Sequence, residues 1–325
     1  MKAITIPVPG DARALTMTEL PDPVPRNGEV LIEVAAAGVN RADINQREGH
    51  YAPPPGAPGW PGLEVSGVVT SLGDGVSGLA VGDRVCALLS GGGYASLAVA
   101  RASHTLPVPD WMDLVDAAAL PEAVATVWSN LFLDAELRAG EILLVHGGSS
   151  GIGTVAIQLA RAHGCLVAVT AGSRQKLDAC AALGADILIN YREEDFVERM
   201  MDATDGYGAD VILDILGGGY LDRNLRSLAR HGRIAIIANQ SVEAGYLDIG
   251  LLMGKWARVS GTMLRSRPID EKDEIMASVL ANAWPLIEAR QVLPVIDERM
   301  PLADAARAHE RMESSEHIGK LLLLP

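Results

Sequence analysis

A glycine-rich string in the middle of the chain restricts the possible fold more than any other feature. The string HGGSSGIG runs from His146 to Gly153, between an apolar run expected to form a strand (142–146) and one expected to form a helix (154–163). Glycines let the backbone turn sharply and approach a pyrophosphate, and the following helix offers unpaired N–H groups at its positive end. In this context the string predicts a dinucleotide-binding loop, the alternative being a plain glycine-rich turn. Its expected cofactor-binding residues are Gly148, Ser150, Gly151, Ile152 and Gly153.

Short apolar runs alternate with helical stretches on either side of this loop. Helices are expected after several of these runs, the clearest at 175–183, just before Gly184. Alternating strands and helices predict a doubly wound parallel sheet, the Rossmann arrangement, with right-handed crossovers. The further strands are expected at 165–170, 187–190, 211–215 and 234–238.

The two ends of the chain differ from the middle in composition and in the pattern of apolar residues. Residues 1–122 carry most of the prolines and many glycines, which predicts a mainly β segment. Residues 123–264 hold the alternating pattern, and residues 265–325 are expected to leave it. The expected strands of the first segment are 30–36, 64–71 and 84–89; the last segment is expected to contain helices at 269–290 and 302–312 and a strand at 320–324.

The stretch after the second strand of the alternating region indicates which cofactor is bound. An NAD site usually places Asp or Glu there to bind the ribose 2′-hydroxyl. Here the stretch has no carboxylate and instead has Ser173, Arg174 and Lys176. A hydroxyl and two cations would bind a 2′-phosphate through charge-assisted hydrogen bonds, so NADPH is predicted. The alternative is an ordinary solvated helix start.

Composition excludes several classes of protein. The net charge of −14 disfavours nucleic acid as a partner. No run of about 18 apolar residues is present, so no membrane span is expected. The three cysteines, Cys86, Cys165 and Cys180, have no CxxC spacing, which suggests a reducing compartment and a cytoplasmic protein.

The glycine-rich loop is also similar to that of short-chain dehydrogenases. Those enzymes need a tyrosine followed by a lysine four residues later, and none of the six tyrosines has such a lysine. We therefore reject that class.

Several strings spread over the chain resemble one family. They are AAGVNRAD (36–43), GHYAPPP (49–55), GLEVSG (62–67), TAGS (170–173), LDILGG (213–218), LRSR (264–267) and HIGK (317–320). In combination they resemble the quinone oxidoreductase group of the medium-chain dehydrogenase/reductase superfamily. The resemblance implies a GroES-like β-rich domain built from both chain ends around an inserted Rossmann domain, a cofactor bound between these domains, and a homodimer joined at Rossmann sheet edges.

Zinc alcohol dehydrogenases share this architecture, so a metal must be considered. Their Gly-His-Glu motif is similar to residues 62–64, but Leu63 replaces the histidine ligand, and Asn40 stands where their first cysteine ligand lies. Cys86 is the only cysteine before position 165, so the four-cysteine structural lobe is absent. Zinc needs several N or S ligands, and the resemblance therefore implies a zinc-independent enzyme with no metal site.

The resemblance also implies catalytic residues. Tyr51 is similar to a family tyrosine that reaches the substrate oxygen, and a phenol can donate to a developing oxyanion. Asn40 and Asp43 are similar to residues near the nicotinamide and substrate. The alternatives are a packing role for Tyr51 and turn capping for the other two. Asn45 stands where some relatives have a second tyrosine, which leaves substrate orientation open.

Four further residues are expected near the cofactor. Thr126 is similar to a threonine beside the nicotinamide, although it can instead bond its own helix backbone. Tyr191 is similar to a residue near the adenosine. Asn239 and Gln240 follow the fifth strand, at the carboxyl edge where ligands gather.

Taken together, these features predict an NADPH-dependent quinone oxidoreductase that transfers hydride directly to a small-molecule acceptor without metal or flavin. The nearest alternative is an NADPH-dependent enone or alkenal double-bond reductase, which needs the same fold and hydride. A non-catalytic NADPH-binding protein is a third possibility.

Overall fold

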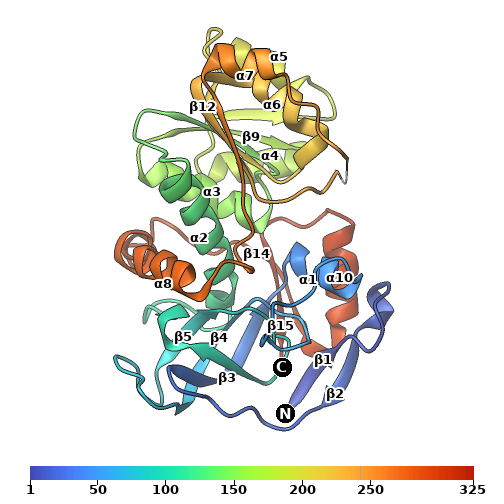
Figure 1. The fold of residues 1–325 in the computed structure, drawn as a ribbon, viewed down its shortest axis with the longest axis vertical. Helices are drawn as coiled ribbons and strands as arrows, with labels where there is room; N and C mark the ends of the chain where they lie inside the picture. The colour runs from blue at the N-terminus through green and yellow to red at the C-terminus, as the bar shows by residue number, and fades with distance from the viewer. Residues whose placement is uncertain (242) are drawn as a thin grey trace. The chain divides into compact units, whose positions relative to one another are not determined.

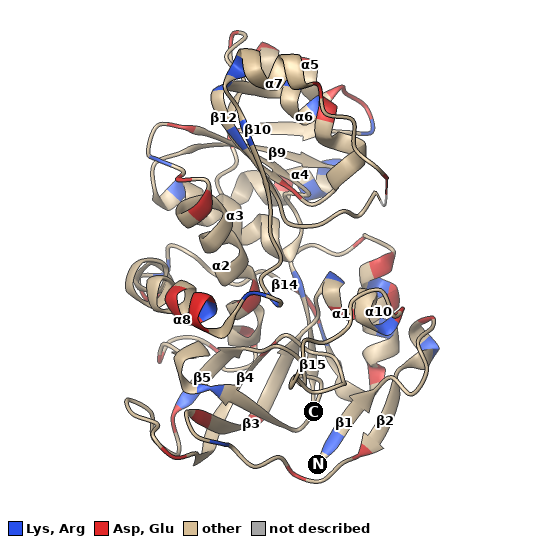
Figure 2. Ribbon diagram, viewed as in Figure 1, with Lys and Arg blue, Asp and Glu red and all other residues tan. Residues whose placement is uncertain are grey.

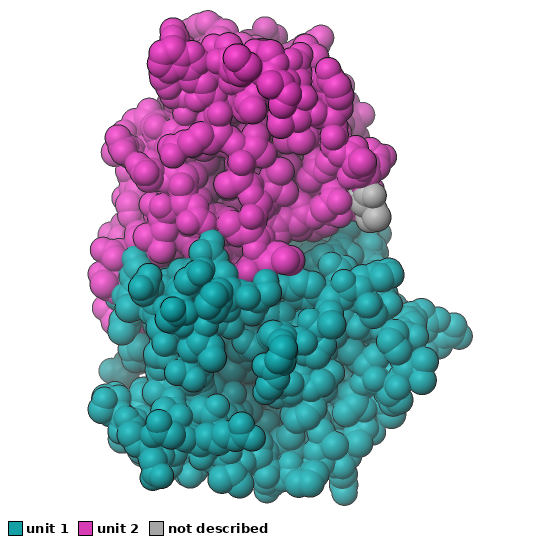
Figure 3. Space-filling view, in the orientation of Figure 1, with its two compact units in different colours: residues 1–123, 265–280, 294–325 teal, residues 124–264, 281–293 magenta. Residues whose placement is uncertain are grey.

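The computed structural model describes residues 1–241 and 243–325, which form two compact units. Unit 1 comprises residues 1–123, 265–280 and 294–325. Unit 2 comprises residues 124–264 and 281–293 (Figure 3). The chain thus starts in unit 1, forms most of unit 2 with residues 124–264, returns to unit 1, passes through unit 2 once more at residues 281–293, and ends in unit 1.

Unit 2 is built on a six-stranded sheet in which every pair of neighbouring strands is parallel. The strands are β8 (Ile142–His146), β9 (Leu166–Ala171), β10 (Ile187–Asn190), β11 (Ala209–Asp214), β12 (Leu228–Ile236) and β13 (Arg258–Gly261). Their order in the sheet is β10-β9-β8-β11-β12-β13. Figure 1 labels β9 and β12 of this sheet among the helices of unit 2. β9 and β10 follow one another outward on one side of β8, and β11, β12 and β13 follow one another outward on the other side, which is the doubly wound Rossmann order.

Helices cover both faces of this sheet. Leu144 packs in one apolar cluster with Phe196 and Met200 of α5 and Leu225 of α6. Because side chains alternate along a strand, Leu143 and Val145 face the opposite side, and all three are fully buried. The helical segments of unit 2 are α2 (Pro121–Val127, which starts in unit 1), η4 (Trp128–Asp134), α3 (Gly151–Ala162), α4 (Arg174–Ala182), α5 (Phe196–Ala203), η5 (Gly217–Tyr220), α6 (Leu221–Ser227), α7 (Ile249–Lys255), η6 (Val279–Ala283, which also starts in unit 1) and α9 (Trp284–Glu288).

Unit 1 contains a mainly antiparallel sheet and a small two-stranded sheet. The small sheet pairs β1 (Lys2–Thr5) with β2 (Thr16–Glu19). The large sheet has the order β14-β15-β3-β4-β5-β7, and β6 pairs with β3. Its strands are β3 (Glu29–Gly38), β4 (Glu64–Leu72), β5 (Arg84–Leu88), β6 (Leu97–Arg101), β7 (Thr105–Pro107), β14 (Ile296–Pro301) and β15 (Lys320–Leu324). Because β15 pairs with β3, the C-terminal strand completes a sheet begun by the N-terminal segment.

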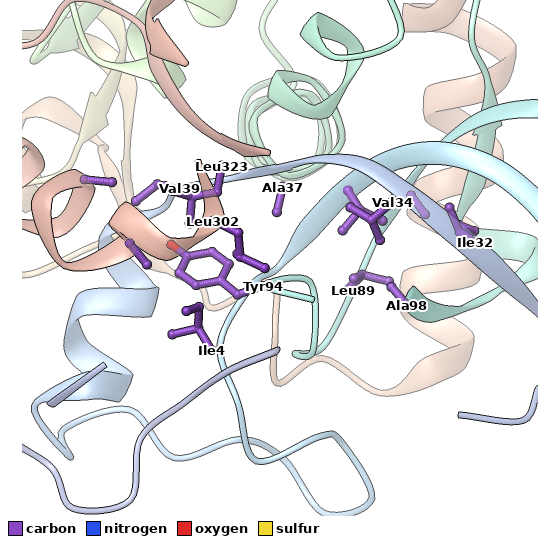
Figure 4. Packing of buried hydrophobic residues seen from close by; sticks show 14 of the residues in the cluster. Ile4, Ile32, Val34, Ala37, Val39, Leu89, Tyr94, Ala98, Leu302 and Leu323 are labelled. Atoms are coloured by element: carbon purple, nitrogen blue, oxygen red, sulfur yellow. The ribbon is translucent and has the colours of Figure 1, made fainter. Parts of the chain in front are cut away.

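The core of unit 1 follows from the alternation along β3. Val30, Ile32 and Val34 are buried, while Glu33 between the last two is exposed. These side chains pack with Tyr94, Leu323 and other residues of one apolar cluster (Figure 4). The helical segments of unit 1 are η1 (Ala12–Ala14), α1 (Arg41–Arg47), η2 (Ala102–His104), η3 (Asp116–Ala119), α8 (Ile269–Ser278), η7 (Leu302–Asp304) and α10 (Ala305–Glu313).

The structure confirms the predicted α/β arrangement, with a doubly wound parallel sheet in unit 2 inserted into a β-rich unit built from both ends of the chain. The strands expected at 142–146, 187–190 and 320–324 are found at those bounds. The single helix expected at 269–290 is wrong in its middle, where the π-helical η6 separates α8 from α9. Pro285 has no N–H to donate to the preceding turn, which accounts for the wider turn before it.

Charged side chains are spread over both units, with acidic and basic residues mixed on helices such as α8 (Figure 2). None of the helices formed by residues 1–241 and 243–325 is long and apolar enough to cross a membrane.

Candidate active site

The glycine-rich loop joins β8 to α3 in unit 2 and brings its backbone segments into close contact. Gly147 has a φ of +70°, a left-handed conformation that glycine adopts without strain. A Cβ on Gly153 would lie 2.4 Å from the carbonyl oxygen of Gly147. A Cβ on Gly148 would lie 2.7 Å from the Cβ of Val169 on the neighbouring strand. The turn therefore requires small residues at these positions.

Ser150 caps the helix that follows this loop. Its hydroxyl oxygen accepts a hydrogen bond of 3.0 Å from the N–H of Gly153. The hydroxyl hydrogen remains available to an acceptor such as a phosphate oxygen. The N–H groups of Gly151 and Ile152, in the first turn of α3, have no partner within the helix. These donors and the nearby glycines fit the pyrophosphate of a dinucleotide.

Cationic and hydroxyl groups gather where β9 ends. Ser173 is the N-cap of α4, which Arg174 begins. A Cβ on Gly172 would lie 2.6 Å from the Tyr191 hydroxyl and 3.1 Å from Nε of Arg192, so both side chains lie against this glycine. The sequence analysis selected Tyr191 but missed Arg192. The signal available for Arg192 was its position just after the strand 187–190.

The two basic residues selected on α4 have different surroundings. The Arg174 side chain is 84% exposed, and its Nε donates to Asp178 at 2.7 Å. Lys176 is half-buried in the first turn of the helix. Ser173, Arg174, Lys176, Tyr191 and Arg192 form what we call the β9-end cluster; three of its five members are cations.

Asn239 and Gln240 follow β12 and bond the segment that follows β11. The side-chain oxygen of Asn239 accepts from the N–H of Gly218 at 3.0 Å. The backbone N–H of Gln240 donates to the carbonyl oxygen of Ile215 at 3.2 Å. Both residues thus lie at the carboxyl edge of the sheet, as expected. Thr126 lies on α2 and is buried.

Unit 1 holds a buried charged group at the start of α1. The ammonium of Lys320 donates to Glu64 and, at 2.7 Å, to the side-chain oxygen of Asn40. Asn40 in turn donates through Nδ2 to Glu64 at 2.9 Å. The second Glu64 oxygen accepts from the N–H of Glu122 at 2.9 Å. Glu64 is fully buried, so its charge depends on these partners.

Asp43 occupies a second buried position beside this group. Its carboxylate accepts from the N–H groups of Asn40 (2.9 Å) and Gly62 (2.8 Å) and from the Tyr94 hydroxyl (3.3 Å). Burial raises the pKa of Asp43 to about 6, an effect that the two backbone hydrogen bonds oppose. Asn40 and Asp43 are therefore brought together, and both are engaged with the surrounding backbone or charges.

Tyr51 lies next to Arg265 rather than in this hydrogen-bonded group. The guanidinium carbon of Arg265 is 5.2 Å from the centre of the Tyr51 ring, within cation–π range. Burial raises the pKa of the Tyr51 hydroxyl, and Glu122 raises it further, whereas Arg265 acts in the opposite direction. The phenol is therefore protonated at neutral pH and can donate a hydrogen bond.

Arg265 is itself 96% buried, with a relative exposure of 4%. Its Nε donates to the Ser90 carbonyl oxygen at 2.8 Å, but its Nη2 has no hydrogen-bond partner among residues 1–241 and 243–325. The ammonium of Lys272 lies nearby and donates to the Arg265 carbonyl oxygen at 3.2 Å. Two buried cations with one unused donor form an environment suited to an oxygen that carries negative charge.

The sequence analysis selected neither Arg265 nor Lys320 as a site residue, although both lie in strings that carried the family resemblance. Glu64 and Lys272 were also missed. A lone acid within an apolar strand run was the available signal for Glu64, because an acid there must be paired when buried.

Within the part of the chain that the structure describes, no three His, Cys, Asp or Glu side chains are grouped closely enough to hold a metal ion. Leu63, in unit 1, is buried.

Comparisons with known proteins agree with this architecture. Residues 26–110 match the alcohol dehydrogenase GroES-like domain, and residues 151–281 match the zinc-binding dehydrogenase family. A quinone oxidoreductase of Rattus norvegicus is 36% identical over 305 residues, which cover 93% of this chain and 91% of that protein.

Two solved structures are similar over the whole chain. A quinone oxidoreductase of Escherichia coli, complexed with NADPH, is 31% identical with a TM-score of 0.88, and the match covers 100% of both chains. A structure described as an NAD-dependent alcohol dehydrogenase is 29% identical with a TM-score of 0.89, again over 100% of both chains.

The fold and these matches define an oxidoreductase with a Rossmann unit and a GroES-like unit. The chain belongs to the medium-chain dehydrogenase/reductase family, and quinone oxidoreductases are among its relatives.

Replacing Gly153 with alanine should destabilise the protein and weaken dinucleotide binding, because the added methyl group meets the Gly147 carbonyl at 2.4 Å. A loss of about 1–3 kcal/mol in the free energy of unfolding is expected from such overpacking. The control is Gly254→Ala, in α7, where an added Cβ has nothing within 4 Å. That variant should gain up to about 1 kcal/mol from helix propensity. Denaturant unfolding of the two variants checks the contrast, and equal stabilities would contradict it.

Replacing Lys320 with methionine should destabilise unit 1, because Glu64 would remain buried without its cation. The expected loss is about 3–5 kcal/mol. The double variant Glu64→Gln/Lys320→Met should be more stable than Lys320→Met alone, since it leaves no uncompensated charge. Chemical denaturation of wild type and both variants measures these differences. A single variant as stable as wild type would show that the ion pair contributes little.

Proposed function

We propose that this protein is an NADPH-dependent quinone oxidoreductase that works without metal or flavin. The observation that carries the proposal is the β9-end cluster, where cations and a serine stand in place of an acidic ribose ligand. The names of the relatives, and the NADPH in the E. coli structure, support it. When bound, NADPH would supply the hydride from nicotinamide C4.

Unit 2 would bind the cofactor and unit 1 the acceptor. Unit 2 would hold the pyrophosphate at Gly148, Ser150, Gly151, Ile152 and Gly153 and the 2′-phosphate at the β9-end cluster. Thr126, Asn239 and Gln240 would complete the cofactor site. Unit 1, which corresponds to the predicted segments 1–122 and most of 265–325, would bind the acceptor.

Residues of unit 1 would stabilise the negative charge that the acceptor oxygen gains when hydride adds to a quinone. The Tyr51 hydroxyl is protonated at neutral pH and would donate to that oxygen. The unused Nη2 of Arg265 and the nearby Lys272 ammonium would add positive potential. A proton from solvent would complete the hydroquinone. Asn40 and Asp43 would act by holding the start of α1 in place, because their polar atoms already bond Glu64, Lys320 and Gly62.

Independence from zinc is part of this proposal. Leu63 and Asn40 occupy the positions similar to two zinc ligands of related dehydrogenases. In unit 1 the Lys320 ammonium contacts both Asn40 and Glu64, so a cation of the chain already neutralises this position. Acceptors that are easily reduced, such as quinones, need no further Lewis acid.

An enone or alkenal reductase is the second candidate, because the donors around Tyr51 would polarise any conjugated carbonyl. A non-catalytic NADPH-binding protein is the third.

We further propose that the protein is a cytoplasmic homodimer. Ile249, Met253, Trp256 and Met263 are exposed apolar residues near β13, the strand at one edge of the unit 2 sheet. Such an edge can pair with that of a second copy. The free, buried state of all three cysteines suits a reducing compartment.

The decisive assay follows oxidation of NADPH by purified protein with a panel of quinones, enones and alkenals, in the presence of a chelator. Turnover highest with quinones supports the proposal. Higher kcat/KM for enones would favour the second candidate, and tight NADPH binding with no turnover would favour the third. Loss of activity on chelation, restored by zinc, would refute the metal-independent mechanism.

NADPH should bind more tightly than NADH, because the 2′-phosphate gains charge-assisted hydrogen bonds at the β9-end cluster. Arg174→Ala/Lys176→Ala should raise the Kd for NADPH about tenfold to a hundredfold, or roughly 1.4–2.7 kcal/mol. Its Kd for NADH should be nearly unchanged. Arg138→Ala/Arg161→Ala removes two exposed cations of the same unit outside the cluster and controls for net charge. Fluorescence titration measures all Kd values, and equal affinity of wild type for both cofactors would disprove the preference.

Tyr51→Phe should lower turnover about tenfold to a hundredfold while leaving NADPH affinity intact, since the lost donor acts on charge that develops in the transition state. Turnover of enones should fall more than turnover of quinones, because reduction of an enone depends more on the Tyr51 hydrogen-bond donor. The ratio of kcat/KM between wild type and variant, measured with one quinone and one enone, tests this. Ratios near one for both acceptors would show that Tyr51 has only a packing role and does not act on the reaction.

A further inference from the structure

Beneath the glycine-rich loop, unit 2 contains a row of four buried polar side chains. Thr170 is the next-to-last residue of β9, His146 ends β8, Asn224 lies on α6 and Asp214 ends β11. Each is at most 1% exposed. Thr170 Oγ1 is 3.1 Å from His146 Nδ1, His146 Nε2 is 2.7 Å from Asn224 Oδ1, and Asn224 Nδ2 is 3.0 Å from Asp214.

The direction of each hydrogen bond follows from the Asp214 carboxylate. Asp214 accepts from the N–H groups of Leu216 (2.7 Å) and Gly217 (3.1 Å), so its third partner, Asn224, presents its NH₂ group to it. The Asn224 oxygen then faces His146 and can only accept. The hydrogen on the His146 ring is therefore on Nε2.

The remaining nitrogen of His146 completes the row. In a neutral ring, Nδ1 is then an acceptor, and the Thr170 hydroxyl must donate to it. The same hydroxyl oxygen accepts from the N–H of Gly147, the first glycine of the loop, at 3.4 Å. The hydrogen bonds thus run in one direction, from Gly147 through Thr170, His146 and Asn224 to Asp214.

The surroundings of His146 keep its ring neutral. Burial, together with Arg223, lowers the pKa of His146 to about 4. Phe196 and Tyr220 pack edge-on against the ring, with centroids 4.8 Å and 5.1 Å away, and Arg223 covers the Phe196 ring. A second ring hydrogen would oppose the Thr170 hydroxyl hydrogen, so the row depends on the neutral form.

This row joins the ends of three neighbouring strands at the sheet edge where the loops leave. At one end it holds Gly147, and the N–H of Gly148 also bonds the Thr170 carbonyl at 3.0 Å. At the other end Asp214 orients Leu216 and Gly217, the start of the segment that Asn239 also bonds. One end is thus the glycine-rich loop assigned above to the cofactor site, and the other is the segment bonded by Asn239 and Gln240, two further residues assigned to that site.

We propose that His146 is a positioning residue for the dinucleotide, held as its Nε2–H tautomer so that the loop at Gly147 and the segment at Gly217 keep one geometry relative to each other. The inference rests on the proposed function, because it assumes that a dinucleotide binds at this edge. Neither His146 nor Asn224 need touch the cofactor.

Thr170 offers the sharpest substitution. Thr170→Val keeps the shape of the side chain and removes the hydroxyl, which leaves Nδ1 of His146 and the N–H of Gly147 unpaired. Thr170→Ser keeps the hydroxyl and loses a methyl group. The matched control is Thr204→Val, because the Thr204 hydroxyl, like that of Thr170, donates one hydrogen bond and accepts one from a glycine N–H. Its partners, the Met200 carbonyl oxygen (2.8 Å) and the Gly208 N–H (2.9 Å), lie outside the row.

Two measurements test the inference. The first is ¹⁵N NMR of histidine-labelled wild-type protein without cofactor, with His146→Gln used to assign the signal. A neutral Nε2–H tautomer between pH 6 and 8 is expected; a charged ring or an Nδ1–H tautomer would overturn the inference. The second is the Kd for NADPH at pH 7.5, with thermal stability recorded for every variant.

Thr170→Val should raise the Kd for NADPH about tenfold, whereas Thr170→Ser and Thr204→Val should stay within about threefold of wild type, even where Thr204→Val lowers the Tm as much. Equal affinities of the Thr170→Val and Thr170→Ser variants would overturn the inference while leaving the proposed function standing. Wild-type protein that binds no NADPH would instead overturn the proposed function, whatever the tautomer. If Thr170→Val does not fold, the inference is still tested by two results: the tautomer of His146 in the wild-type protein and the Kd of Thr170→Ser for NADPH.

Discussion

The parallel alignment of six strands is the constraint on which unit 2 depends. Because all the strands run in one direction, their carboxyl ends lie at one edge, and every loop that leaves that edge belongs to one region. The glycine-rich loop after β8, the β9-end cluster and the segments after β11 and β12 are separated by up to about a hundred residues in sequence, yet the sheet brings them together. Burial of strands such as β8 on both faces stabilises this arrangement.

Unit 1 meets a different constraint, since it must bury both members of the Lys320–Glu64 ion pair. Glu64 lies in a strand of the sheet and Lys320 begins the C-terminal strand, so the ion pair forms only when the last residues of the chain have returned to the sheet. Asn40 bonds both members and also begins α1. The same contacts therefore neutralise a buried acid and connect three segments distant in sequence. Removing either charged partner alone would leave the other buried and unpaired.

Local patterns account for what the sequence predicted well. The glycine-rich string was predicted to lie between a strand and a helix, and it joins β8 to α3. This could be predicted because glycine conformation and helix capping depend on neighbours in the chain. Arg265 and Lys320 were not selected, since their importance depends on contacts with Ser90 and Glu64, which are 175 and 256 residues away. Likewise, Arg192 lies near Gly172 and the rest of the β9-end cluster only because β10, which it follows, pairs with β9. The helix expected at 269–290 was extended through a proline whose missing N–H changes the turn before it.

Glu64 of unit 1 and Asp214 of unit 2 are both buried acids, but they are held in opposite ways, and the difference has a physical reason. In unit 1 the Glu64 charge is balanced by a full cation, which fixes position but is costly to disturb. In unit 2 the Asp214 charge is balanced by neutral donors, namely two backbone N–H groups and the Asn224 amide. A cation beside Asp214 would bond it from any direction, whereas an amide has one donor end and one acceptor end. Because Asn224 must donate to Asp214, it must accept from His146, which in turn fixes the Thr170 hydroxyl as the donor to the His146 ring. A row of hydrogen bonds with fixed directions can set the geometry of a backbone loop, which an ion pair could not do.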